Sequence, residues 1–110
     1  MALACRRPLE KPAQVLFQFE SPFEGELTIF NDPKSPNSLA TVDGSLVVSV
    51  DPSTRNTYNG SNWPDHFQTR ARFADGSPVQ TTIIIQSAKY SISVVGWDSS
   101  KNMVIKMTKN

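Results

Sequence analysis

The segment His66–Phe73 reads HFQTRARF, and its strict alternation of side chains decides the fold class. Two sets of alternate positions differ in polarity, with Phe67, Thr69, Ala71 and Phe73 in one set and His66, Gln68, Arg70 and Arg72 in the other. Successive side chains of a β-strand point to opposite faces of its sheet. The segment is therefore predicted to be a half-buried strand, with one face on a core and one in water.

The same period of two recurs along the chain. In Ser45–Asp51 (SLVVSVD), three apolar residues alternate with polar ones. Asp43 and Gly44 just before it form a dipeptide typical of hairpin turns. Short runs of strand-forming residues bounded by turn formers predict further strands over Gln14–Glu20, Glu26–Asn31, Leu39–Val42, Thr81–Ser87, Lys89–Trp97 and Asn102–Thr108.

Helices are not expected, because the eight prolines interrupt most windows and Val79–Asn110 is rich in β-branched residues. We therefore predict an all-β, single-domain antiparallel β-sandwich, or a small barrel, of about seven or eight short strands. Residues 14–110 form this domain. Residues 1–13 have no strand pattern and are expected to be a flexible N-terminal tail.

Composition restricts the class of protein. The chain has 110 residues, 38% of them hydrophobic, and a formal net charge of +1. This charge gives no general attraction to nucleic acid or anionic lipid. No apolar run approaches the roughly 18 residues of a transmembrane helix. The start lacks the apolar core of a signal peptide, and Cys5 alone cannot form an intramolecular disulfide, so we expect a cytoplasmic protein.

Catalysis and metal binding are not expected. His66 is the single histidine, and Asp65 cannot easily orient it because strand neighbours point to opposite faces. Cys5 has Arg6 and Arg7 nearby but no base. One histidine and one cysteine cannot form a zinc site, and neither a calcium loop nor a glycine-rich phosphate loop is present. We predict a non-enzymatic protein without a metal or cofactor.

The longest candidate loop, Asp51–Asp65 (DPSTRNTYNGSNWPD), combines aromatic, amide and carboxylate side chains. Such groups can bind the apolar faces and hydroxyls of sugars. The candidate ligand-binding residues are those of the loop and of the polar strand face that follows it: Arg55, Tyr58, Asn59, Asn62, Trp63, Asp65, His66, Gln68 and Arg70. Two other interpretations compete here, namely Trp63 folded onto the core as a lid and Asn59-Gly60 as a simple turn.

Protein interaction is the competing prediction. Three consecutive isoleucines, Ile83 to Ile85, place apolar groups on both faces of the strand expected at Thr81–Ser87. That strand is then either central and covered on both sides, or covered by another subunit. A homodimer is compatible with this pattern. Nucleic-acid binding through the polar face of His66–Arg72 is disfavoured, because that face has no aromatic residue to stack a base.

We therefore predict a non-catalytic binding module that acts through protein–protein interaction or self-assembly. The alternative is a lectin-like module that binds a glycan through the Asp51–Asp65 loop. Trp63 discriminates between the two, since an exposed, flat indole favours sugar binding. A buried indole together with an exposed isoleucine segment favours assembly.

Overall fold

The computed structural model describes residues 14–37, 45–60, 63, 67–82 and 84–110. The regular structure of these residues consists of seven β-strands, which confirms the all-β prediction. Their bounds are β1 Gln14–Phe19, β2 Gly25–Asn31, β3 Ser45–Val50, β4 Asn56–Tyr58, β5 Gln68–Phe73, β6 Tyr90–Trp97 and β7 Met103–Lys109.

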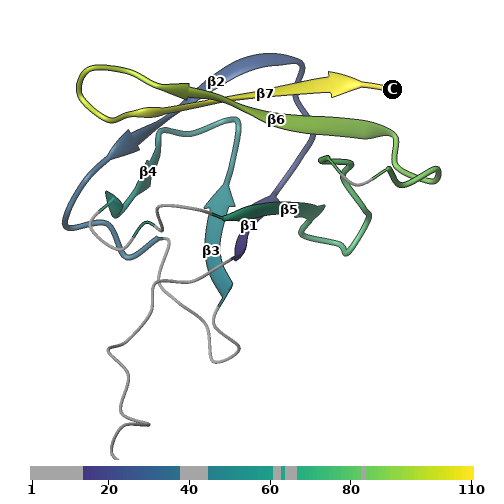
Figure 1. The fold of residues 1–110 in the computed structure, drawn as a ribbon, viewed down its shortest axis with the longest axis horizontal. Helices are drawn as coiled ribbons and strands as arrows, with labels where there is room; N and C mark the ends of the chain where they lie inside the picture. Colours follow the sequence, from purple (N-terminus) through teal and green to yellow (C-terminus); the bar gives the residue numbers. More distant parts are fainter. Residues whose placement is uncertain (1–13, 38–44, 61–62, 64–66, 83) are drawn as a thin grey trace, which may run out of the picture.

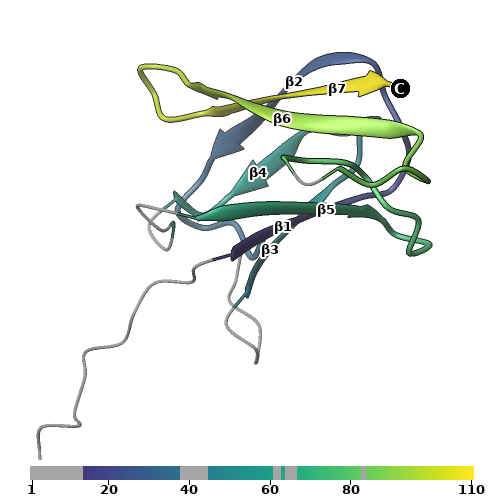
Figure 2. The same cartoon turned by 45° about the vertical axis from the view of Figure 1, so that its right-hand side comes forward.

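The strands form two sheets that lie one above the other (Figures 1 and 2). The three-stranded sheet has the order β3-β1-β5, and the four-stranded sheet has the order β4-β2-β7-β6. The ladder does not run continuously from one sheet into the other, so no closed barrel forms within the described part of the chain.

The predicted antiparallel arrangement is wrong for much of the structure. Strand β1 pairs in parallel with both β3 and β5, and β2 pairs in parallel with β4. The antiparallel pairs among the seven described strands are those of β7 with β2 and with β6. The reason is that the chain crosses to the other sheet after each strand from β1 to β5. Two crossings restore the original direction, so strands of one sheet that are separated by two crossings run parallel.

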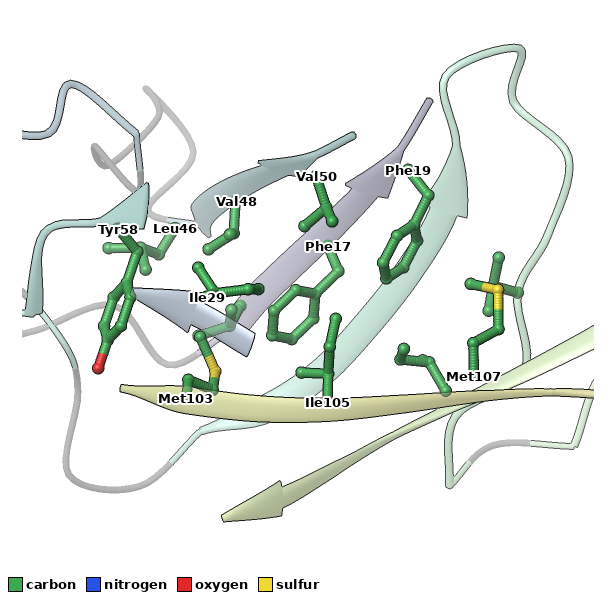
Figure 3. Close-up of a cluster of buried hydrophobic side chains, with 13 residues drawn as sticks. Phe17, Phe19, Ile29, Leu46, Val48, Val50, Tyr58, Met103, Ile105 and Met107 are labelled. Carbon is green, nitrogen blue, oxygen red and sulfur yellow. The ribbon is translucent and has the colours of Figure 1, made fainter. Parts of the chain in front are cut away.

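The core lies between the two sheets and is built from alternate residues of their strands (Figure 3). The predicted apolar face of β3 is confirmed, since its three core side chains have no exposed surface. The alternation in β5 is confirmed as well, because its polar set is exposed and its apolar set packs on the core. The buried cluster comprises Val15, Phe17, Phe19, Ile29, Leu46, Val48, Val50, Tyr58, Val79, Ile92, Met103, Ile105 and Met107.

On one side, the Asn37 side chain joins the edges of the two sheets. Its Oδ1 accepts a hydrogen bond from the Ser49 N–H, and its Nδ2 donates to the carbonyls of Ser49 and Thr57, each at 2.9 Å. Ser49 belongs to edge strand β3 and Thr57 to edge strand β4. One amide side chain therefore takes the place of a neighbouring strand for both edges.

On the other side, the segment Ser77–Gln80 joins β5 to β6. The Phe73 N–H donates to the Ser77 carbonyl and the Val79 N–H to the Ala71 carbonyl. Gln80 then exchanges two hydrogen bonds with β6, donating to the Tyr90 carbonyl at 2.9 Å and accepting from the Ile92 N–H at 2.8 Å. The segment occupies the position of a short strand between the two sheets.

The strand predicted at Thr81–Ser87 does not form in its described residues, 81, 82 and 84–87. The chain leaves the edge of β6 after Gln80, and the Ala88 N–H donates back to the Ile85 carbonyl at 3.0 Å. β-branched composition favours a strand, but a strand also needs a partner edge, and this segment pairs with none.

Other predictions fall outside the described residues, namely the tail 1–13, the strand Leu39–Val42 and the turn Asp43-Gly44. The connector Ser21–Gly25 is a corner between sheets, since β1 and β2 belong to different ones. Asp98–Asn102 forms the hairpin loop between β6 and β7. No helix of the described chain is long and apolar enough to cross a membrane.

Replacing Asn37 tests the bridge between β3 and β4. Asn37→Ala is expected to lower the free energy of unfolding by about 0.5 to 1.5 kcal/mol, because partly exposed backbone groups lose a paired partner. Asn37→Asp, of similar shape, should cost at least as much, since it places a carboxylate oxygen against the Ser49 and Thr57 carbonyls. Urea unfolding measures both. An unchanged midpoint in Asn37→Asp would contradict this role.

Candidate functional site

The Asp51–Asp65 segment is not one long loop, because it contains β4. Asn56 organises the turn before β4: its Oδ1 accepts from the Asp51 N–H, and its Nδ2 donates to the carbonyls of Asp51 and Thr54. Hydrogen bonds from the side chain and backbone of Ser53 lower the pKa of Asp51. Many of the polar side chains that suggested a recognition loop therefore form hydrogen bonds within this turn.

Tyr58 and Trp63 belong to an aromatic cluster at one end of the molecule rather than to an exposed platform. Tyr58 is 2% exposed and lies in the core. Trp63 packs against the core, and its ring meets those of Tyr58, Phe67 and Trp97 edge to face at centroid distances of 5.0, 5.5 and 6.4 Å. The indole N–H of Trp63 is buried and has no hydrogen-bond partner among the described residues. We call these four residues the aromatic cluster.

A hydrogen-bond chain fixes the partly exposed member of the cluster, Trp97. Its Nε1 donates to the Tyr58 hydroxyl at 3.1 Å, and that hydroxyl donates to the Lys101 carbonyl at 2.6 Å. Burial raises the pKa of Tyr58, with a smaller contribution from the charge of Asp98. The phenol therefore stays protonated at neutral pH and can act as donor and acceptor at once.

The structure does not bring the remaining predicted site residues together. Arg55 lies with its guanidinium carbon 4.1 Å from the centre of the Phe30 ring, on the outer side of the four-stranded sheet. Gln68 and Arg70 lie exposed on the outer face of the three-stranded sheet, on the opposite side of the molecule. Asn59 donates to the Pro33 carbonyl at 3.2 Å. These side chains do not form one continuous binding surface.

Three predicted site residues, Asn62, Asp65 and His66, lie outside the described residues. Among the residues that the structure describes, no group of three or more histidine, cysteine, aspartate or glutamate residues could hold a metal ion.

Three large apolar side chains are exposed in the described chain: Ile84 at 78%, Val95 at 55% and Trp97 at 44%. Exposure of the isoleucine run was one of the expectations from the sequence, whereas exposure of Val95 and Trp97 was not predicted. The sequence did indicate an outward apolar side chain here, because Val94 and Val95 are consecutive and must point to opposite faces of β6. The glycine that follows is a further signal, since glycine inside a strand pattern often marks a bulge.

A bulge in β6 orients Trp97. The register with β7 shifts between Val94 and Gly96, and Gly96 has a φ of 155°. Val94 packs on the core and Val95 points outward, so simple alternation would also point Trp97 outward. The extra residue returns Trp97 to the aromatic cluster, where its ring meets that of Phe67 at 6.4 Å.

The outer edge of β6 is paired over only half of its length. Tyr90 and Ile92 direct their backbone groups outward to Gln80, so by the period of two Val94 directs its groups outward as well. Beyond the bulge, the Asp98 N–H points toward β7 and donates to the Asn102 carbonyl. The backbone N–H and C=O of Trp97 therefore point away from β7, to the outer edge. No described segment hydrogen-bonds this edge from Val94 to Trp97. We call Val94–Trp97 the open edge.

A cavity of about 520 Å³ lies at the opposite end of β5 and β6 from the aromatic cluster. Its apolar wall includes Phe73 and Tyr90, whose rings meet edge to face at 5.7 Å. Charged groups of both signs line the same cavity, namely Glu20, Asp75 and Lys89, and neither Glu20 nor Lys89 forms an ion pair with a described residue. The full lining is Glu20, Pro22, Phe73, Ala74, Asp75, Ser77, Pro78, Ser87, Lys89 and Tyr90.

Gly96→Val tests whether the bulge positions Trp97. The positive φ of Gly96 disfavours any side chain, so the substitution should lower the free energy of unfolding by about 1 to 3 kcal/mol. Tryptophan fluorescence should shift as Trp97 leaves the aromatic cluster. Ser93→Val on the same strand is the control, and its stability should change by less than about 0.5 kcal/mol. Equal stability of the two variants would refute the role of Gly96.

Comparison with known proteins does not assign the chain to a group. No family model matches it, and neither a curated protein nor a solved structure shows significant similarity to it. The aromatic cluster, the open edge and the cavity are therefore the features from which a function can be inferred.

Proposed function

We propose that this protein is a two-sheet sandwich that acts as a non-catalytic binding module through protein–protein contact. The first partner to test is a second copy of the chain. The observation that carries the proposal is the open edge of β6, which combines unpaired backbone groups with the exposed side chains of Val95 and Trp97.

Unpaired strand edges readily accept further strands, and proteins usually protect them with charges, prolines or covering segments. The other edges of this protein carry such protection along part of their length. The Asn37 side chain covers β3 and β4, and the segment Ser77–Gln80 covers the second half of β5. Strand β6 has no charged residue and no proline, and a bulge alone interrupts its open edge.

The state of Trp63 supports the same proposal. Its indole N–H is buried and its ring packs on the core, which is the arrangement expected of a structural residue and not of a sugar platform. Ile84, from the isoleucine run, is the most exposed large apolar residue described. Exposed apolar groups of this kind mark surfaces that contact other proteins.

Val95→Lys tests the proposal. Wild-type protein is expected to form dimers or larger species in a light-scattering dilution series. The lysine should raise the dissociation constant at least about tenfold, because a charge on an edge strand opposes pairing. Val95 is exposed, so folding should be preserved.

Thr108→Lys is the matched control, because Thr108 is also exposed on a strand of the four-stranded sheet. Its dissociation constant should equal that of the wild type. A wild-type protein that stays monomeric at every concentration would contradict self-association. Equal weakening by both lysines would show that β6 is not the contact.

A second candidate function is binding of a neutral glycan in the 520 Å³ cavity rather than at the Asp51–Asp65 loop. An aromatic and proline wall suits the apolar face of a sugar ring. Hydroxyl groups both donate and accept, so they can pair with Glu20 and Lys89 together, whereas a simple cation or anion meets a like charge there.

Glu20→Gln and Tyr90→Phe test this candidate on an array of neutral glycans. If the cavity binds sugar, wild-type binding should fall at least about tenfold in each variant, consistent with the loss of one hydrogen bond to a charged or hydroxyl group. Glu26→Gln, on the outer face of the other sheet, is the control. Absence of wild-type binding, or equal binding by all variants, would reject glycan binding in the cavity.

A further inference from the structure

The segment Thr81–Ser87 has the composition of a strand but is not paired in its described residues, and the open edge of β6 has no strand paired with it. Both lie on the same side of the molecule. The segment begins directly after Gln80, which is the last residue paired with β6. The open edge begins at Val94, two residues after the last partner of Gln80. The connection between β5 and β6 lies beside the right-hand half of β6, where that strand begins, in both views (Figures 1 and 2).

The segment Thr81–Ser87 has the composition of a strand. Its TTIIIQS sequence begins with five consecutive β-branched residues, and no charged residue occurs from Gly76 to Ala88. Its described residues, 81, 82 and 84–87, have no ladder partner, and Ile84 is 78% exposed. An apolar β-branched side chain with so much exposed surface gains free energy from burial, roughly 25 cal/mol for each Å² removed from water.

The open edge needs a partner of this kind. Outward N–H and C=O groups at Val94 and Trp97 require backbone partners, and the exposed side chain of Val95 offers apolar contact. Because β6 is uncharged, an uncharged strand meets no repulsion there. The two features are complementary in hydrogen bonding, apolarity and charge.

We propose that the segment Thr81–Ser87 of one molecule adds to the open edge of β6 in a second molecule, and that the exchange is reciprocal in a twofold dimer. This inference rests on the proposed function and names its partner and its contact. In a reciprocal exchange, the segment Thr81–Ser87 and the open edge of β6 are paired in both copies, as expected of a closed symmetric interface. Each four-stranded sheet then gains a fifth strand beyond β6.

Ile84→Lys tests the exchange, with Ile84→Val as the matched control. Ile84 is exposed, so both variants should fold like the wild type, as checked by circular dichroism and urea unfolding. The dimer dissociation constant from light scattering should rise at least tenfold in Ile84→Lys and stay within twofold in Ile84→Val. Equal dissociation constants in the two variants would overturn the role of the segment.

Amide hydrogen exchange of the wild-type dimer locates the contact. The Val94 and Trp97 amides should be protected in the dimer and exchange rapidly in the Ile84→Lys monomer. A dimer with unprotected Val94 and Trp97 amides would overturn the exchange and leave protein interaction as the function. A monomer that protects them would show that the segment closes its own edge, which overturns the second copy as occupant. A monomer without protection would overturn both the exchange and self-association.

Discussion

The requirement that every backbone hydrogen-bonding group find a partner shapes this protein at its sheet edges. The chain alternates between two sheets, so four strand edges face one another in two pairs along the sides of the core. One pair is connected by a single side chain, that of Asn37, and half of the other pair by the segment Ser77–Gln80. The open edge of β6, which belongs to the unpaired half, is where the proposed interaction occurs.

The aromatic cluster explains why the open edge keeps a defined shape without a covering strand. Three edge-to-face contacts hold Trp63 against Tyr58, Phe67 and Trp97, and the Tyr58 hydroxyl anchors the Trp97 indole. Such contacts add about 0.5 to 1.5 kcal/mol each beyond simple burial. The bulge at Gly96 directs Trp97 into this cluster and leaves Val95 on the outside. Packing at the end of the molecule therefore determines which side chains of β6 a partner meets.

Sequence reasoning was most reliable where it used the period of two. Alternation identified β3 and β5 with the correct buried faces, because face assignment depends only on local geometry. The strand predicted at Thr81–Ser87 was wrong, because β-branched composition indicates a preference for extended backbone and not the presence of a partner edge. Tyr58 was similarly grouped with polar loop residues, although β4 carries it into the core.

The sequence by itself determined the all-β class, the positions of six of the seven strands and the core faces of β3 and β5, since these follow from side-chain periodicity and from the backbone limits of proline and glycine. Only the tertiary structure decided the parallel pairing, the closure of the edges and the separation of Arg55 from Arg70. Pairing partners are chosen by contacts between residues far apart in the chain. No local pattern records which edge remains without a strand, and in this protein that edge is the basis of the proposed function.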